Sequence, residues 1–166
     1  GGEITHLDVA IDKDGNARVL VGARNAETDK SSVTVHSLDA TPTKSLVSSE
    51  SKQLKWLRFY RSGETYGVSS AFGEPEKVTS LSLSTDALGD DARSEVTLIP
   101  PIAASTIRAV VVDSANVTLL CGKITVGAEV GSTYRVLRGT GAVSPLEQSS
   151  FIGCCPCLLY TSPSPR

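Results

Sequence analysis

The chain carries few side chains that could do chemistry, and these lie far apart in the sequence. Its only histidines, His6 and His36, belong to different predicted strands, and neither is part of an HxH or HxxxH pattern that would suggest a metal site. Each falls on the polar side of its segment, so we expect both to face solvent. Asp90 and Asp91 are adjacent in a polar stretch, which a solvated loop explains better than a catalytic pair. The sequence also lacks a G-x-S-x-G motif, a phosphate-binding loop and zinc spacing, and we therefore predict no catalytic, cofactor-binding or metal-binding residue.

The segment DKDGN at residues 12–16 combines two acidic residues with glycine and asparagine. It is similar to the calcium loops of integrin-type propeller blades. Calcium takes roughly six to eight oxygen ligands, most of them from alternating acidic side chains and a closing carboxylate. Here Arg18 and Val19 follow instead, and the corresponding turns at residues 61–65 and 113–116 lack the alternating acids. A hairpin turn rich in residues that tolerate left-handed backbone is the better interpretation.

The cysteines suggest neither a disulfide framework nor a metal site. Cys121 lies in an apolar segment, where we expect a small buried hydrophobic side chain. Cys154 and Cys155 are adjacent, and their Cα atoms are too close for easy bridging. This usage favours a reducing compartment, so we expect an intracellular protein, cytoplasmic or nuclear.

A basic set interleaved with aromatic residues raises the possibility of nucleic-acid binding. The set consists of Lys52, Lys55, Arg58 and Arg61, with Trp56 and Tyr60 between them. In a strand these cations lie on two opposite faces, so they do not form one continuous basic surface. The net charge of −2 provides no electrostatic footprint for nucleic acid or an anionic membrane.

The elements that position these residues centre on residues 54–84. Leu54, Trp56 and Tyr60 share one parity while Leu57 and Phe59 share the other, which predicts a strand buried on both faces. A helix capped by Ser49 is the rival interpretation, and the β-branched and aromatic residues downstream disfavour it.

Two further strands complete this central unit. Turns at residues 61–64 and 73–76 lead into strands at 66–71 and 78–84. In the last strand Leu81 and Leu83 alternate with Ser80, Ser82 and Ser84, which predicts a half-exposed strand with its hydroxyls towards solvent.

Similar strands flank the central unit. They are predicted at residues 4–12, 17–24, 32–38, 43–48, 94–99, 106–113, 117–126 and 132–138. In the first of these, Leu7, Val9 and Ile11 share one face, and His6 and Asp8 share the other. Pro100 and Pro101 are expected to stop the strand at 94–99, Gly122 to mark a bulge, and residues 139–145 to form a loop.

The pattern repeats about every 50 residues, which is typical of β-propeller blades. The aligned positions are Val9, Phe59 and Val111 in the first strands, Val19, Val68 and Val117 in the second, and Val35, Leu83 and Val136 in the third. The predicted fold is all-β, a partial β-propeller of about three four-stranded blades at about residues 4–51, 52–103 and 104–153. A β-sandwich is the alternative architecture.

The segments LKWLRFY, RSGET, YGVSSA and VTSLSLS resemble a WD-type propeller repeat in their order. The Gly-His pair that opens such repeats and the Trp-Asp pair that closes them are missing, so the resemblance is to a divergent WD40-like propeller. It implies a non-catalytic scaffold that binds other proteins, and we expect the loops at 25–31, 85–93 and 139–145 to form the contact surface. The alternatives are a carbohydrate-binding propeller and a fragment of a propeller hydrolase whose active site lies in further blades.

The last ten residues, CLLYTSPSPR, resemble the conceptual translation of a transposase-type sequencing-library adapter. We therefore treat residues 154–166 as a non-native or disordered tail and expect the natural protein to continue past about residue 156. Three blades without a closing ring leave open sheet edges and uncovered apolar faces, so we expect the chain alone to be poorly behaved.

Overall fold

The computed structural model describes residues 2–11, 14–38, 44–49, 52–62, 65–85, 93–104, 106–125 and 128–146. All the regular secondary structure in these ranges is β-strand, which confirms the predicted all-β class. None of the described residues forms a helix long and apolar enough to cross a membrane.

Within these ranges the strands form three four-stranded antiparallel sheets, each following the order of the chain. The first sheet contains β1 (Gly2–Ile11), β2 (Ala17–Asn25), β3 (Ser31–Ser37) and β4 (Lys44–Ser49). The second contains β5 (Gln53–Ser62), β6 (Thr65–Glu74), β7 (Lys77–Ser84) and β8 (Arg93–Ala103). The third contains β9 (Thr106–Val112), β10 (Asn116–Thr125), β11 (Ala128–Leu137) and β12 (Val143–Leu146).

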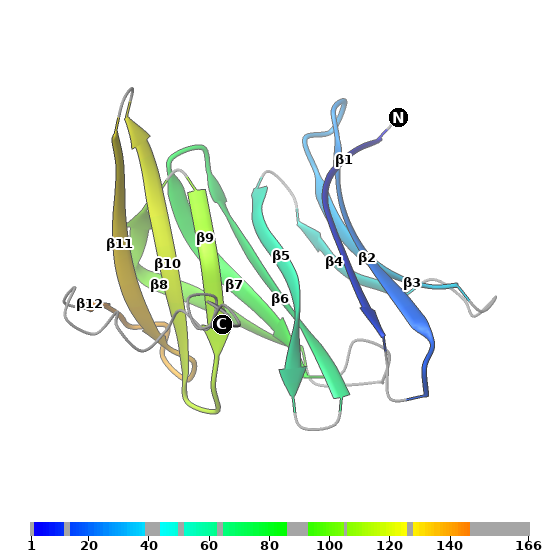
Figure 1. Ribbon diagram of the computed structural model, residues 1–166. Helices are drawn as coiled ribbons and strands as arrows, with labels where there is room; N and C mark the ends of the chain where they lie inside the picture. Colours follow the sequence, from blue (N-terminus) through cyan, green and yellow to red (C-terminus); the bar gives the residue numbers. More distant parts are fainter. Residues whose placement is uncertain are drawn as a thin grey trace, which may run out of the picture.

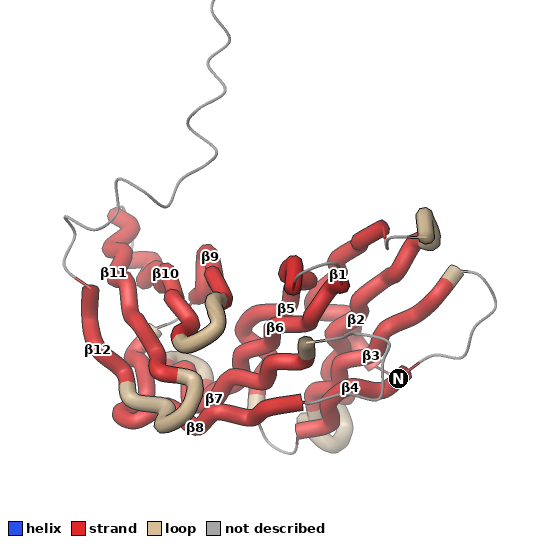
Figure 2. The backbone as a smooth tube through the Cα atoms, turned by 90° about the horizontal axis from the view of Figure 1, so that it is seen from below, coloured by secondary structure: helices blue, strands red, loops and turns tan. Residues whose placement is uncertain are grey.

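The three sheets stack face to face, with the second in the middle (Figure 1). Their first strands, β1, β5 and β9, lie next to one another in that order. Figure 2 shows these strands towards one side of the molecule and β4, β8 and β12 towards the other. The sheets therefore diverge from a shared inner edge.

The second sheet is buried on both faces, as predicted for residues 54–60. We call the face towards the first sheet its A face; there Leu57, Val68 and Phe72 pack with Leu20 and other residues of the first sheet. The opposite face is its B face, where Ala71, Leu81 and Leu83 pack with the third sheet. In the first and third sheets, A and B name the faces whose residues are equivalent in strand pairing to those of the second sheet. The B face of the first sheet thus packs on the A face of the second, and the B face of the second on the A face of the third.

In β1 the apolar side chains face solvent and His6 faces the second sheet, which is the reverse of the expected orientation. Leu7, Val9 and Ile11 are 55%, 56% and 54% exposed, whereas His6 and Asp8 lie on the B face, towards β5. Strand alternation determines which residues share a face, but the neighbouring sheet determines which face is covered. The expectation that His6 faces solvent was therefore wrong.

The hydroxyl face of β7 is also buried, contrary to prediction. Ser80, Ser82 and Ser84 are only 1%, 4% and 7% exposed. Lys52 Nζ donates to Ser80 Oγ at 3.4 Å, and the carbonyl of Ser82 accepts from Ser70 Oγ at 3.3 Å. Serine is small and its hydroxyl can hydrogen-bond locally, so a serine-rich strand face can lie under another sheet.

The outer strands β8 and β12 differ most from prediction. β8 continues through Pro100 and Pro101, and its register with β7 shifts between the pairs Val78–Ile102 and Ser80–Thr97. The prolines lie in this irregular stretch of an outer strand, where fewer ladder donors are needed. Residues 143–146, of which 143–145 were expected to belong to a loop, form β12.

The pairing tests the proposed repeat positions. Val19, Val68 and Val117 are equivalent, because they pair with Val9, Phe59 and Val112. In the third unit, two predicted positions are wrong by one residue. The equivalent of Val9 and Phe59 is Val112, not Val111. The equivalent of Val35 and Leu83 is Arg135, not Val136. The irregular pairing in this unit lies between Leu120 and Cys121, opposite Ala109 and Ile107, rather than at Gly122.

Gly67 permits a close contact that fixes β5 to β7. Tyr60 lies over it and donates its hydroxyl to the carbonyl of Ser84 at 3.1 Å. A Cβ at Gly67 would lie 2.3 Å from the Ser84 carbonyl oxygen and 2.5 Å from the Tyr60 ring.

We expect Gly67→Ala to lower the free energy of unfolding by about 1–3 kcal/mol, because backbone as well as ring atoms must move. Urea denaturation followed by circular dichroism measures this change. Gly139→Ala is the control, since a Cβ there meets nothing within 4 Å. Equal stability of the two variants would contradict the role assigned to Gly67.

Candidate functional site

The described residues hold no group of three His, Cys, Asp or Glu side chains suited to a metal ion. His6 is on the B face of the first sheet, whereas His36 pairs with Val19 on its A face, so the two point away from each other. Asp14, Gly15 and Asn16 belong to the β1–β2 turn, where Gly15 has a φ of 83° as expected for a hairpin. Asp12, Asp90, Asp91, Cys154 and Cys155 lie outside the described residues.

Cys121 is a buried hydrophobic side chain, as predicted. It is 3% exposed among the apolar residues between the second and third sheets. Burial raises the pKa of its thiol to about 11, so the group stays protonated near neutral pH. The thiol is therefore a poor nucleophile in the folded protein.

The most concentrated polar chemistry lies between β1 and β5, in a group that we call the polar joint: His6, Asp8, Arg58 and the backbone of Phe59. Asp8 Oδ2 accepts from the Phe59 backbone N–H at 2.9 Å. Its other oxygen, Oδ1, lies 3.4 Å from Arg58 Nη1. Arg58 Nη1 also donates to the carbonyl of Leu7 at 3.1 Å. Both carboxylate oxygens of Asp8 thus bind the neighbouring sheet.

The polar joint continues across β5 to the B face of the second sheet. The Arg58 guanidinium carbon lies 5.7 Å from the centroid of the Trp56 ring, within range of a cation–π interaction. Trp56 Nε1 donates to Ser69 Oγ at 3.2 Å, and Ser69 Oγ donates to the Arg58 carbonyl at 3.3 Å. Arg58 therefore contacts β1 of the first sheet as well as Trp56 and Ser69 of its own sheet. We call this role of the polar joint a structural clamp, because it holds β1 against β5.

The basic residues of this region do not form a stripe. Lys52 reaches Ser80, and Lys55 Nζ donates to the Pro75 carbonyl at 2.8 Å, while Arg58 turns to Asp8. These three side chains therefore have separate partners, which fits the expectation that the basic set does not form one stripe; the contacts do not include Arg61.

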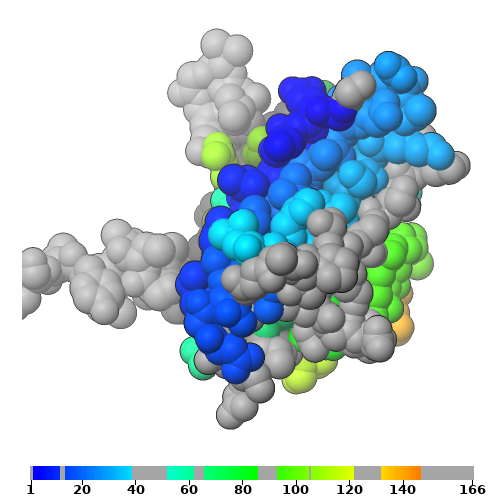
Figure 3. Space-filling view, turned by 90° about the vertical axis from the view of Figure 1, so that its right-hand side faces the viewer, coloured from blue at the N-terminus to red at the C-terminus, as the bar shows by residue number. Residues whose placement is uncertain are grey.

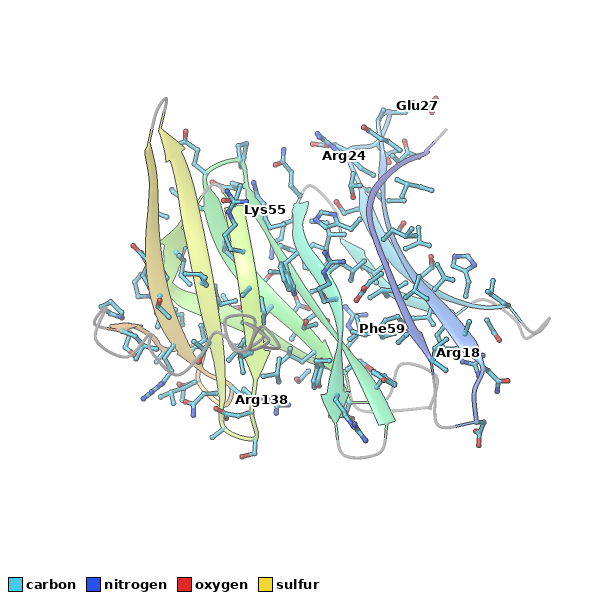
Figure 4. The ribbon with its side chains drawn as sticks, in the orientation of Figure 1. Arg18, Arg24, Glu27, Lys55, Phe59 and Arg138 are labelled. Atoms are coloured by element: carbon cyan, nitrogen blue, oxygen red, sulfur yellow. The ribbon has the colours of Figure 1, made fainter. Side chains whose placement is uncertain are left out.

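The turn between β2 and β3 is exposed and held by its own side chains. Asn25 Oδ1 accepts from the backbone N–H groups of Glu27 and Thr28 at 2.9 and 3.2 Å. Arg24 Nε donates to Asp29 Oδ1 at 2.6 Å, and Asp29 has a φ of 55°. This turn lies at the same end of the molecule as Lys55 (Figure 4).

The turn between β9 and β10 lies at the opposite end (Figure 1) and is fixed in a similar way. Asp113 Oδ1 accepts from the backbone N–H groups of Asn116 and Ala115 at 2.6 and 2.8 Å. These hydrogen bonds, that of Asn116 first, lower the pKa of the Asp113 carboxyl. Arg138 Nη1 donates to the Asp113 carbonyl at 2.9 Å and so ties the β11–β12 turn to this end.

The loops predicted as one contact surface therefore occupy two ends of the molecule. Antiparallel strands in chain order place the β2–β3 turn at one end and the β7–β8 and β11–β12 connections at the other. Residues 86–92 of the middle loop lie outside the described residues. The turn of residues 138–142 also packs back on the second sheet, where the Gly141 carbonyl accepts from the Ile99 N–H at 2.9 Å.

Comparison with models of known protein families, with curated proteins and with solved structures finds no match to this chain.

The polar joint was not predicted from the sequence. A signal was present in Asp8, a carboxylate between apolar residues of a strand, and in Arg58, which stands at the same place in the second unit. The two become partners only when β1 and β5 are placed side by side.

We expect Asp8→Ala to lower the free energy of unfolding by about 1–3 kcal/mol, because the Phe59 N–H and Arg58 lose their shared acceptor. Glu27→Ala removes the same charge from an exposed turn and is expected to change stability by less than about 0.5 kcal/mol. Chemical denaturation of both variants at one pH makes the comparison. A cost for Asp8→Ala no larger than that for Glu27→Ala would refute the clamp.

His6 should make folding stability depend on pH. Burial lowers the pKa of its imidazole below the ordinary 6.5, a hydrogen bond with the Lys55 backbone opposes this, and the charge of Arg58 lowers it further. Protonation therefore favours the unfolded chain. The stability contribution of neutral His6 is complete above pH 6.5 and declines as the pH falls from there through the lowered pKa.

A His36→Gln variant leaves His6 as the single histidine, and its NMR titration midpoint is expected below 6.5. In the same background, His6→Gln should remove part of the loss of stability between neutral and mildly acidic pH. A midpoint at or above 6.5 would overturn this account.

Proposed function

We propose that the chain forms three successive blades of a divergent WD40-like β-propeller and acts as a non-catalytic scaffold that binds other proteins. The observation that carries the proposal is the repeated stacking: three four-stranded sheets in chain order, with β1, β5 and β9 as neighbours at the inner edge. Radial arrangement of such sheets around their first strands is the propeller architecture.

The burial of the second sheet on both faces supports blades over a sandwich. In a two-layer sandwich each sheet packs one face on the core and turns the other to solvent. Here Leu57 on the A face and Leu81 on the B face are 1% and 2% exposed. A central layer of this kind fits a series of stacked blades better than a two-layer architecture.

The surface best suited to protein partners is what we call the charged end, formed by the β2–β3 turn and the β6–β7 turn. Its exposed charged residues are Glu27, Asp29, Lys30, Glu74, Glu76 and Lys77. Asn25 and the Arg24–Asp29 ion pair hold the first turn in place, so a partner meets charges already positioned on rigid strands. Mixed charges of this kind provide specificity and steering in protein association.

The test is quantitative affinity purification from the source cells with the chain as bait, followed by affinity measurement for the recovered partners. We expect Lys30→Glu combined with Lys77→Glu to weaken binding at least about tenfold, since each reversal opposes the original complementarity. Arg61→Glu combined with Arg93→Glu makes the same change in net charge at the opposite end and should leave binding within about twofold.

Equal loss in both double variants, or no partner whose affinity responds to either, would refute the assignment of the charged end. Binding of the wild-type chain to immobilised glycans, unaffected by the charge reversals, would favour the carbohydrate-binding alternative instead.

A further inference from the structure

The A face of the first sheet is apolar along its inner strands, and its side chains on β1 are exposed. Ile4, Leu7, Val9 and Ile11 are 65%, 55%, 56% and 54% exposed along β1. They pair with Ala23, Val21, Val19 and Ala17 of β2, which extend the same face. Figure 3 shows the first sheet, in blue, at the surface on this side of the molecule. A contiguous apolar face of this kind marks an interaction site.

Equivalent positions in the other two sheets are buried. Each first strand has a register irregularity directly after one apolar residue: Ile4 in β1, Leu54 in β5 and Ile107 in β9. Ile4 is 65% exposed, whereas Leu54 and Ile107 are each 8% exposed. Leu7 is 55% exposed and its equivalent, Leu57, is 1% exposed. The preceding B face accounts for the difference, because it covers the second and third A faces, whereas no sheet among the described residues covers the first.

The B face of the third sheet is exposed near the β9–β10 turn, although Thr133, further along the same face, is only 7% exposed. Val110 and Val112 pack into the core next to the second sheet, so Val111 between them points the other way and is 53% exposed. Leu137 pairs with Asn116 on the same face and is 46% exposed. This is the kind of face that covers an A face twice within the chain.

We propose that a second copy of this chain covers the open A face, with the B face of its third sheet seated on the first sheet of its neighbour. Within the chain, the B face of one sheet packs on the A face of the next sheet twice. The proposed contact between two copies joins the same two kinds of face. The proposal rests on the stacking part of the proposed function and is independent of the charged end.

The polarity of the two faces matches across this contact. Near the inner edge, apolar Val111 meets the Ile4, Leu7 and Val9 row. Further out, exposed Arg135 occupies the third-strand position of the B face. The A face carries Ser32, Thr34 and His36 on its third strand, so polar groups meet polar groups there. The association is head to tail, and it gives closed rings or growing chains according to the rotation between copies.

The test is light scattering coupled to size-exclusion chromatography over a range of concentrations, on the whole chain. We expect the wild type to self-associate, and Leu7→Glu and Val111→Glu each to be monomeric, since each places a charge in one half of the contact. Both sites are exposed, so circular dichroism should show the folded spectrum for both variants. Ile99→Glu, at a site 63% exposed on β8 and away from both faces, should associate like the wild type.

Mixing the two monomeric variants makes the decisive measurement. The Leu7→Glu copy retains an intact B face and the Val111→Glu copy an intact A face, so the mixture should form a one-to-one dimer that neither forms alone. A monomeric wild type at every concentration would overturn the proposal while leaving the charged-end test of partner binding unaffected. Self-association that survives Val111→Glu but not Leu7→Glu would also overturn it, because two A faces would then be in contact.

Discussion

A strand with apolar residues on both faces requires a neighbouring layer on each side, and β5 imposes this requirement on the molecule. Leu57 and Phe59 need a sheet on one side, while Trp56 packs towards the other. Burial of apolar area is the main favourable term in folding, so the first and third sheets are held in place chiefly by covering the second. The connections along the chain then place β1 and β9 on either side of β5.

Polar residues are accommodated between the stacked sheets because they are hydrogen-bonded there. Asp8 lies within a sheet contact because the Phe59 N–H and Arg58 satisfy its carboxylate, and buried polar groups are tolerated when they are hydrogen-bonded. The serines of β7 occupy a buried face for the same reason. The contact between the first two sheets is therefore part apolar and part polar, with polar groups at the inner edge where β1 meets β5 and again along the serines of β7.

Local pattern was sufficient to predict the all-β class and the place of most strands. Alternation located β1 to β11, and the equivalence of Val19, Val68 and Val117 follows from spacing alone. The errors arose where the outcome depends on a neighbour. The inward turn of His6, the burial of Ser82 and the pairing of Asp8 with Arg58 all require knowledge of which sheet lies opposite. β12 is too short to show an alternation of its own, and the prolines of β8 obscured the continuation of that strand.

The stacking has a direction, because every internal contact joins a B face to the A face that follows. A unit of this kind is self-sufficient as an evolutionary module: a tandem duplication of about 50 residues inserts one new sheet and leaves both flanking contacts chemically unchanged. Lineages can thus lengthen or shorten such an array by recombination within the coding sequence, without a compensating substitution at either junction.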